Sequence, residues 1–346
     1  MREVVIVGGA RSAIGTFGGS LKDVPSRDLG ATVVKEALNR SGVTPEQVQH
    51  VVIGNVVHAD AHDDPYLARV VGVKAGIPIE VPGLTLNRRC GSGLEAICTA
   101  ARMILLDECD VAVAGGVETM SRVPYHLPAE RWGARMGHGQ TTDALVAALN
   151  DPFHRIHMGM TAENLAERYE IPREKQDEFA MESNRRAIAA IDEGRFKEQI
   201  VPIPVKSRKG EAFFDTDEHP KRGTSMEQLG TLKPVFKQGG TVTPGNASGI
   251  NDGAAAVVLM SREKAEELGL KPRAKLVGFA TAGVEPTIMG IGPVPAVQNV
   301  MRRTGHSIDE MDVIELNEAF AAQAISVMQD LNMPWEKTNP NGGAVA

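Results

Sequence analysis

The chain has only three cysteines among its 346 residues, Cys90, Cys98 and Cys109. They form no CxxC pair and no dense framework, which excludes a small disulfide-stapled secreted domain and favours a reducing compartment, so we expect a cytoplasmic protein. No apolar run approaches the roughly 18 residues of a membrane span, and the first residues resemble a strand rather than a signal peptide. With a net charge of −7, the chain also lacks the basic field expected of a nucleic-acid-binding protein.

The size and composition are those of an ordinary globular protein. A chain of 346 residues, 42% hydrophobic and 23% charged, can form about two domains with a large core. Its 36 glycines lie largely in short clusters, which indicates tight turns and backbone close to a ligand. The early cluster GGARSAIGTFGG lacks the GxGxxG spacing, so a dinucleotide site is disfavoured.

The stretch around Cys90 has the pattern expected of a nucleophilic turn. An apolar run ends at Leu86 and a helical pattern begins at Leu94, so Cys90 lies where a strand turns into a helix. A helix dipole and free backbone N–H groups there would lower the thiol pKa. Gly91 and Gly93 permit a tight turn and the approach of an acyl group. We predict an acyl-accepting nucleophile, the alternative being a buried structural cysteine.

Hydrophobic periodicity predicts an α/β fold. Apolar runs that suit strands covered on both faces occur at Val4–Val7, Val51–Ile53, Asp110–Ala114, Ala254–Met260 and Ala274–Phe279. Helical spacing is found over Leu29–Arg40, Ala68–Ala75, Leu94–Leu106, Thr161–Tyr169 and Arg173–Glu193. A hairpin is expected over Ile203–Asp215, within a region from about Ser121 to Thr241 that we interpret as an insertion.

Two segments of the chain repeat one pattern. LGATVVKEALNRSGVTPEQVQHVVIGN aligns with VPAVQNVMRRTGHSIDEMDVIELNE when Gly42 is placed on Gly305. In both, a helix ends at glycine, a short turn that begins with Thr or Ser follows, and an apolar strand comes next. A duplicated βα unit is the simplest interpretation, with Gly54 and Asn317 at equivalent strand ends. Because ligands bind beyond the carboxyl ends of such strands, Asn317 is expected near the Cys90 half of the site.

Taken together, seven motifs resemble the thiolase family. They are NRRCGSG at 87–93, GGVETMS at 115–121, HMGMTAEN at 157–164, GNASGINDGAAA at 245–256, MGIGPVPA at 289–296, NEAFAAQ at 317–323 and NPNGGA at 339–344. They occur in the family's order across essentially the whole chain, which makes the resemblance highly specific. Within the family, DPFHRIHMG is most similar to bacterial acetyl-CoA acetyltransferases and broad-range β-ketothiolases.

The resemblance implies an α/β thiolase-like fold, a duplicated five-layer αβαβα core with an inserted loop domain, assembled as a homodimer or homotetramer. We expect an N-terminal thiolase domain over residues 1–262, including the loop domain over 121–247, and an incomplete C-terminal domain over 270–346. No metal, flavin or nicotinamide cofactor is implied, because coenzyme A thioesters are the substrates. No nucleic-acid or membrane partner is implied either.

The resemblance also implies residue roles. Cys90 matches the cysteine that becomes acylated, and its backbone N–H matches a donor of one oxyanion hole. Asn317 matches the asparagine that, through a water, helps to hold a thioester oxygen in another oxyanion hole. Further positions match residues beside the pantetheine, the adenine or the phosphates of the substrate: His157, Met158, Lys221, Arg222, Leu232, Ser248, Met289, Ala319 and Phe320.

One departure from the family pattern is decisive. In the family, a GHP motif with the catalytic histidine and a CxGGG motif with a second, proton-handling cysteine follow NxNGGA. Neither motif occurs among these 346 residues. We therefore expect a chain truncated at its C-terminus and unable to complete the reaction, since such catalytic groups act as a unit. Smaller departures are Pro244 and the stretch from His58 to Asp64.

Several residues permit two interpretations. His58, Asp60 and His62 could converge on a metal if they formed a strand, but a solvated or interface loop is favoured. Arg208 and Lys209 could reach phosphates, although a charged hairpin tip is usually only solvated.

The remaining alternatives lie close to the proposed substrate site. His157 could cap the following helix or line the ligand site. Arg88 and Arg89 could lower the Cys90 pKa or make subunit contacts. Cys98 is expected in the core, on the inner face of the same helix.

The predicted function is acyl transfer from and to coenzyme A through an acyl-Cys90 intermediate. The reaction is condensation of two acetyl-CoA molecules to acetoacetyl-CoA and coenzyme A, or the reverse thiolysis. One alternative is a longer-chain 3-ketoacyl-CoA thiolase of fatty-acid degradation. Another, from a different class, is an inactive acyl-CoA-binding protein.

Overall fold

A computed structural model describes residues 2–207 and 210–346 of the chain. The chain forms two compact units. The described residues within 2–148, 197–207, 210–218 and 250–276 make up the sheet unit, and residues 149–196, 219–249 and 277–346 make up the helical unit. Within the described residues, no helix is both long and apolar enough to cross a membrane.

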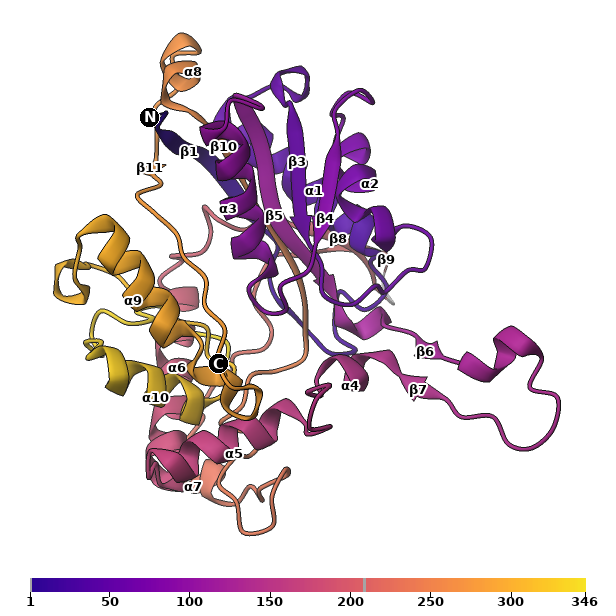
Figure 1. Cartoon of the computed structure of the whole chain (residues 1–346), viewed down its shortest axis with the longest axis vertical. Coiled ribbons are helices and arrows are strands. Elements are labelled where there is room, and N and C mark those ends of the chain that lie inside the picture. Colours follow the sequence, from indigo (N-terminus) through magenta and orange to yellow (C-terminus); the bar gives the residue numbers. More distant parts are fainter. Residues whose placement is uncertain (1, 208–209) are drawn as a thin grey trace. The chain divides into compact units, whose positions relative to one another are not determined.

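The sheet unit is built on a seven-stranded mixed sheet with the main strand order β11-β1-β10-β5-β3-β4 (Figure 1). Its strands are β1 (Val4–Arg11), β2 (Gly15–Thr16), β3 (His50–Gly54), β4 (Gly83–Leu86), β5 (Val111–Thr119), β10 (Asn251–Ser261) and β11 (Ala274–Lys275). β10 pairs antiparallel with β1, β2 and β5, whereas β3 pairs parallel with both β5 and β4. Gly54 is in register with Leu86 on one side and Gly116 on the other, so β3 and β4 end level with each other.

Helices cover both faces of the central part of this sheet, which explains why β3 and the middle of β5 and β10 are apolar. The helices are α1 (Ser26–Ser41), α2 (Leu67–Lys74), α3 (Ser92–Leu105) and α8 (Arg262–Glu267). Neighbouring residues of β5 identify the two faces, because alternate side chains of a strand point in opposite directions. Gly116 lies against Gly93 of α3, whereas Val117 lies against Gly30 of α1.

Two glycines bring α3 unusually close to the sheet. A Cβ atom on Gly54 would lie 2.5 Å from the carbonyl carbon of Ser92, and one on Gly116 would lie 3.3 Å from the Cα of Gly93. The first turn of α3 therefore rests directly on the backbone at the end of β3 and at Gly116 of β5. This contact fixes the distance between the N-terminus of α3 and the sheet.

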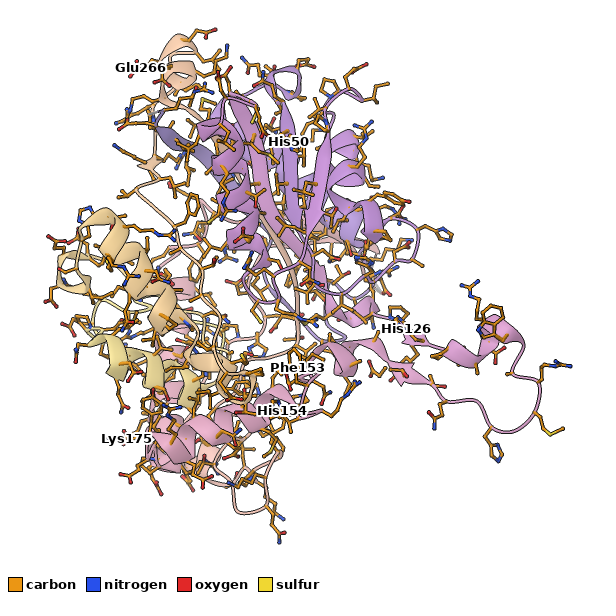
Figure 2. All side chains as sticks on the ribbon, viewed as in Figure 1. His50, His126, Phe153, His154, Lys175 and Glu266 are labelled. Atoms are coloured by element: carbon orange, nitrogen blue, oxygen red, sulfur yellow. The ribbon has the colours of Figure 1, made fainter. Side chains whose placement is uncertain are left out.

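The remaining elements of the sheet unit are short. β6 (Tyr125–His126) and β7 (Thr142–Asp143) pair antiparallel at the base of a long arm, followed by α4 (Ala144–Ala148). Figure 2 shows His126 on this arm. β8 (Ile203–Ser207) and β9 (Gly210–Phe214) form the expected hairpin. Short 3₁₀ turns occur at Pro45–Gln47, Asp64–Tyr66, Met120–Arg122 and Pro128–Trp132.

The helical unit consists of α5 (Met158–Arg168), α6 (Arg173–Asp192), α7 (Met226–Gly230), α9 (Pro293–Thr304) and α10 (Ala321–Leu331), with 3₁₀ turns at Pro286–Ile291 and Ile308–Glu310. Its main core is formed by buried side chains from α5, α6, α9 and α10, among them Leu165, Phe179 and Val327. Burial of each such large apolar side chain contributes about 1.5–3 kcal/mol. A tight loop that contains Phe153 and His154 leads into α5 (Figure 2).

The predicted internal repeat is confirmed at the level of local conformation. α1 ends at Gly42 (φ 71°) and α9 ends at Gly305 (φ 78°), both left-handed. Thr44 and Ser307 then begin matching 3₁₀ turns, each with a capping box. The second expected strand is wrong, however, because after the turn only Ile314 forms an isolated parallel bridge, with Thr338.

The expected helices agree with α1, α2, α3, α5 and α6 to within about three residues at each end. The strand predicted over Ala274–Phe279 is shorter, since β11 comprises Ala274 and Lys275 alone. β5 is longer than predicted and continues through the glycines of GGVETMS to Thr119. That extension matters for the site, because it carries the strand past Gly54.

The contact between β3 and α3 yields a stability prediction. Replacing Gly54 with Ala should lower the free energy of unfolding by about 1–3 kcal/mol, because the added methyl group overlaps the Ser92 backbone. Urea denaturation measures the change. Gly139→Ala is the matched control, since Gly139 has no atom within 4 Å of an added Cβ. Equal stability of the two variants would contradict the predicted close contact.

Candidate active site

Cys90 lies in the turn between β4 and α3, as the sequence predicted. β4 ends at Leu86, Gly91 is the N-cap of α3, and the Cys90 residue is exposed. Arg89 adopts a left-handed conformation with φ 49°, which is uncommon for a residue other than glycine. The chain thus reverses sharply just before the thiol and presents it at a helix N-terminus.

Side chains on both sides of Cys90 hold this turn. The Asn87 carboxamide donates to the carbonyl of Val56 (2.8 Å) and accepts the Arg89 N–H (2.9 Å). The Ser92 hydroxyl accepts the Arg88 N–H (2.8 Å) and donates to the Arg89 carbonyl (2.6 Å). These bonds give the turn a defined shape, together with the backbone hydrogen bond from the Ser92 N–H to the Arg89 carbonyl (2.9 Å).

The prediction that the Cys90 pKa is lowered was wrong. Although the residue is exposed, partial removal of water from around the sulfur raises the pKa of the thiol, and the negative charge of Glu118 adds to this. The backbone N–H of Cys90 and the charge of Arg89 act in the opposite direction. Desolvation outweighs both of these contributions, so the thiolate needs a further base or cation to form at neutral pH.

The two arginines have different partners. Arg88 forms an ion pair with Glu95 of α3 (3.2 Å), which Arg102 also contacts (2.6 Å). Arg89 is the one whose charge favours the Cys90 thiolate. From the sequence, either arginine could lower the Cys90 pKa or make subunit contacts, because the sequence of an irregular turn does not reveal where each side chain points. Cys98 is 7% exposed and belongs to the core, as predicted.

Glu118 is a site residue that the sequence reasoning missed. It extends β5 beyond Gly116 and accepts hydrogen bonds from the N–H groups of Val56 (2.8 Å) and Val57 (3.1 Å) and from Asn55 (3.2 Å). Burial raises its pKa to about 7, despite these hydrogen bonds. The signal that could have found it is the carboxylate in GGVETMS, directly after the strand glycines.

In the helical unit, His157 is the N-cap of α5. Its Nδ1 accepts the Gly159 N–H (3.0 Å), so the capping interpretation is confirmed. The ring also stacks on Phe236 at 4.7 Å, and Phe236 meets Phe320 edge to face at 6.2 Å. Gly159 is required here, because a Cβ at that position would lie 2.3 Å from the Phe236 ring. Burial lowers the pKa of His157, so the ring is neutral at pH 7.

Several predicted binding residues gather around this aromatic cluster. Met158, Ala319 and Phe320 belong to the same small apolar cluster. Ser248 is joined to it through its N–H, which donates to the Ala319 carbonyl (3.0 Å). Leu232 packs in a neighbouring cluster with Leu229. Met289 lies in the 3₁₀ turn before α9.

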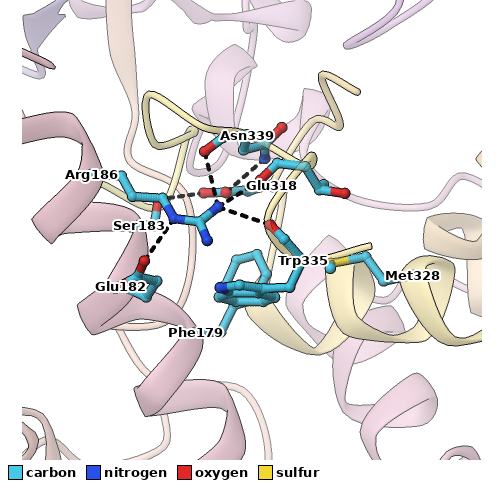
Figure 3. A pocket seen from close by; sticks show the side chains of 9 residues that line it. Phe179, Glu182, Ser183, Arg186, Glu318, Met328, Trp335 and Asn339 are labelled. Carbon is cyan, nitrogen blue, oxygen red and sulfur yellow. Dashed lines mark hydrogen bonds and ion pairs between the residues drawn. The ribbon is translucent and has the colours of Figure 1, made fainter. Parts of the chain in front are cut away.

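Asn317 is exposed in a loop whose two neighbours are firmly anchored. Asn339 accepts the N–H of Leu316 (2.7 Å) and donates to its carbonyl (2.8 Å). The buried carboxylate of Glu318 accepts hydrogen bonds from Ser183 (2.7 Å) and Asn339 (2.7 Å). Figure 3 shows these side chains converging on Glu318.

Arg186 completes this anchor from α6. Its guanidinium donates to the carbonyls of Trp335 (3.1 Å) and Thr338 (2.7 Å) and pairs with Glu182, while it lies 5.1 Å from the Trp335 ring (Figure 3). The backbone on either side of Asn317 is therefore tied to α6 and to the segment 335–339. The exposed Asn317 side chain remains available to a ligand.

Of the basic residues predicted beside the substrate phosphates, Lys221 and Arg222, only Lys221 lacks, within the described part of the chain, an ion pair that engages its side chain. Arg222 forms a bidentate ion pair with Asp192 (2.5 and 2.9 Å), whereas the Lys221 backbone N–H is held by Asn184 (2.9 Å). The Lys221 side chain is therefore the freer of the two for a phosphate group. Arg208 and Lys209 lie outside the described residues.

Among the described residues, no group of three His, Cys, Asp or Glu side chains is arranged to hold a metal ion. The stretch from His58 to Asp63 is a loop, in which Asp60 accepts the N–H groups of His62 and Asp63. Arg27 forms ion pairs with Asp60 and Asp63. This agrees with the loop interpretation.

The predicted site residues are divided between the two units. Cys90 belongs to the sheet unit, whereas Asn317 and the predicted substrate-binding residues belong to the helical unit. The structure brings together His157, Met158, Ser248, Ala319 and Phe320.

Known proteins and family models match this chain over nearly its whole length. The model of "Thiolase, N-terminal domain" matches residues 4–263, and that of "Thiolase, C-terminal domain" matches residues 270–346. Beta-ketothiolase BktB of Cupriavidus necator is 56% identical over 346 residues, which are 100% of this chain and 88% of that protein. An acetyl-CoA acetyltransferase of Syntrophomonas wolfei is 50% identical, with the same coverage of both chains.

Solved structures give the same result for the fold. The acetyl-CoA acetyltransferase of Bacillus anthracis superposes with a TM-score of 0.97 at 48% identity, covering 100% of this chain and 87% of that one. Human mitochondrial 3-ketoacyl-CoA thiolase has a TM-score of 0.97 at 43% identity, with the same coverage. The predicted fold class is confirmed by these similarities.

The raised pKa of Glu118 predicts how stability depends on pH. Its pKa rises from an ordinary 4.5 to about 7 on folding, so the folded state holds the proton more tightly. The resulting stabilisation is complete below pH 4.5 and is lost as the pH rises through 7. The unfolding free energy of the wild type, relative to Glu118→Gln, should fall by up to about 3 kcal/mol from pH 4.5 to 8.

Urea denaturation of both proteins at several pH values measures this difference. Glu182→Gln is the control, because ion pairs with Arg185 and Arg186 lower the pKa of Glu182 to about 2. Its contribution is constant above about pH 5.5. A pH-independent difference for Glu118→Gln would show that this carboxylate has an ordinary pKa.

Proposed function

The chain belongs to the thiolase family, and we propose that it transfers acyl groups between coenzyme A and Cys90. The reaction is the condensation of two acetyl-CoA molecules to acetoacetyl-CoA and coenzyme A, or the reverse thiolysis. The observation that carries the proposal is the exposed residue Cys90 in a fixed turn at the N-terminus of α3. The names of the relatives are those of enzymes, which gives no support to the inactive alternative.

The first half-reaction begins with the Cys90 thiolate. Its sulfur attacks the carbonyl carbon of an acyl-CoA thioester, and the oxygen takes up negative charge in a tetrahedral intermediate. The intermediate collapses with cleavage of the carbon–sulfur bond to coenzyme A, which leaves as a thiolate and takes a proton. The backbone N–H of Cys90 is a donor available to the oxyanion, and such a donor is worth about 3 kcal/mol.

In the second half-reaction, the α-carbanion of another acetyl-CoA attacks the acyl-Cys90 carbonyl. A carbon–carbon bond forms, the Cys90 carbon–sulfur bond breaks, and the thiolate is regenerated. We propose that Asn317 helps to hold the thioester oxygen during this exchange. The proton transfers that the family assigns to its GHP and CxGGG motifs are not assigned to residues of this chain.

The substrate-binding roles remain proposals. His157, Met158, Ala319 and Phe320 offer an apolar, partly aromatic surface suited to the pantetheine arm and its acyl group. Ser248 and Met289 are proposed beside that arm, and Leu232 beside the adenine. Lys221 and Arg222 supply positive charge for the phosphates, with Lys221 the freer side chain.

A preference for short acyl chains is supported by relatives named acetyl-CoA acetyltransferase at 48–50% identity over 99–100% of this chain, such as those of Syntrophomonas wolfei and Pseudomonas aeruginosa. A longer-chain specificity is the alternative, since the chain also resembles human 3-ketoacyl-CoA thiolase. Rates on acetoacetyl-CoA and on a longer 3-ketoacyl-CoA distinguish the two. The predicted dimer or tetramer, the cytoplasmic location and the division at residues 262 and 270 stay predictions.

Cys90→Ser should abolish acyl transfer, with a loss of at least about 1000-fold in kcat, because a hydroxyl is far less ionised than a thiol. The direct test incubates the wild type with acetyl-CoA and looks for one added acetyl group on the Cys90 peptide by mass spectrometry. Cys98→Ala is the control and should keep the adduct. Absence of acetylated Cys90 from the intact wild type would refute the proposed nucleophile.

Asn317→Ala should lower kcat by about 100- to 1000-fold with little change in KM, because an oxyanion donor acts mainly in the transition state. Steady-state kinetics on acetoacetyl-CoA and coenzyme A measure the split. Asn299→Ala is the control, since Asn299 lies on α9 and contacts Arg302. A rise in KM at unchanged kcat would instead make Asn317 a ground-state binding residue.

A further inference from the structure

Glu118 is a partly buried carboxylate for which the proposed reaction supplies no role. It lies beyond Gly116, where the parallel strands β3, β4 and β5 reach one edge of the sheet. The polypeptide leaves this edge at Asn55 after β3 and at Asn87 after β4. Glu118 thus lies at the carboxyl ends of the strands that carry the Cys90 turn.

Hydrogen bonds connect Glu118 to this turn step by step. Its carboxylate accepts the N–H groups of Val56 and Val57. The carbonyl of Val56 accepts a hydrogen bond from the Asn87 carboxamide (2.8 Å). The oxygen of that carboxamide accepts the Arg89 N–H (2.9 Å), and Arg89 precedes the nucleophile.

These hydrogen bonds matter because they maintain a strained backbone conformation at Arg89. Arg89 has φ 49°, a conformation that a non-glycine residue retains only where its surroundings impose it. Asn87 imposes it from one side, and Asn87 is itself held by the backbone that Glu118 anchors. Asn55 strengthens this anchor, since its side chain donates to both Glu118 (3.2 Å) and the Val117 carbonyl (3.0 Å).

Glu118 also acts on Cys90 through its charge. Ionised Glu118 raises the pKa of the Cys90 thiol, whereas Arg89 lowers it. The other carboxylates that act on Glu118 are Asp64, from the 3₁₀ turn after β3, and Asp252 of β10, and both raise its pKa. Protonation of Glu118 therefore removes one negative charge that opposes formation of the Cys90 thiolate.

We propose that Glu118 is a positioning residue for the nucleophile. It holds the Val56–Val57 backbone, and through Asn87 it holds the strained turn that presents Cys90. The part that concerns acyl transfer rests on the proposed function. The part that concerns thiol reactivity does not.

The first experiment measures alkylation of Cys90 by iodoacetamide between pH 6 and 9 in the wild type and in Glu118→Gln. Mass spectrometry follows the peptides of Cys90, Cys98 and Cys109 separately. The ratio of the Cys90 rates, variant over wild type, should be near one at pH 6 and reach about threefold at pH 8, because only then is Glu118 charged. The rates of the buried Cys98 and Cys109 should not change.

A purely structural role would give a different pattern. Local unfolding would change the Cys90 ratio equally at all pH values and expose Cys98 and Cys109 as well. Glu163→Gln is the matched control, because Glu163 is a buried carboxylate that accepts the N–H groups of Thr241 and Val242 in the helical unit. It should leave the Cys90 profile at that of the wild type.

The second experiment measures the rate at which acetyl-CoA acylates Cys90 in Glu118→Gln, Asn87→Ala and the double variant. Each single change should slow acylation about tenfold, since a displaced nucleophile loses alignment. The double variant should be no slower than about tenfold, because both residues act through the same backbone. A loss of about 100-fold in the double variant, or a pH-independent alkylation ratio, would overturn the proposal.

The two experiments separate this proposal from the proposed function. If the wild type alkylates at Cys90 but is not acylated by acetyl-CoA, the acyl-transfer function fails. The alkylation ratio still decides the role of Glu118 in that case.

Discussion

The geometry of the nucleophile depends on the contact of the first turn of α3 with the end of β3 and with Gly116 of β5. Gly54 and Gly116 bring the helix backbone onto the strand backbone, so the N-terminus of α3 has a fixed height above the sheet. The turn between β4 and α3 must then span a set gap, and Arg89 adopts a left-handed conformation to do so. The side chains of Asn87 and Ser92 hydrogen-bond to the backbone of Arg88 and Arg89 in this reversal. Packing thus determines where the thiol lies, and polar side chains determine its orientation.

In the helical unit, the loop that carries Asn317 is held in place by side-chain hydrogen bonds. Asn317 has no strand to support it, since the second copy of the repeat keeps the helix and its cap but forms only an isolated bridge at Ile314. Its neighbours are held by side chains instead: Asn339 binds Leu316, and Glu318 is buried among hydrogen-bond donors. Arg186 ties the same segment to α6. Duplication has kept the local turn, while the support beneath it differs.

Much of the fold could be predicted from the sequence because it depends on local patterns. The helix ends at Gly42 and Gly305 follow from left-handed caps, and the strands follow from apolar runs. The position of Cys90 in a strand-to-helix turn was predicted on the same grounds. Its raised pKa was not, because desolvation depends on what surrounds the sulfur, and periodicity does not reveal that. Glu118 was missed for the same reason, since its partners Val56 and Val57 are distant in sequence and act through backbone N–H groups.

The hydrogen bond that begins α5 has a consequence for the chemistry of His157. Since Nδ1 accepts the Gly159 N–H, the neutral ring must carry its hydrogen on Nε2. The tautomer is therefore selected by the helix, and the stacked Phe236 keeps the ring in that plane. A molecule bound at the Nε2 edge meets a hydrogen-bond donor and never a lone pair. Because His157 caps α5, its Nε2 edge can only donate a hydrogen bond, for example to the carbonyl oxygen of a thioester or an amide.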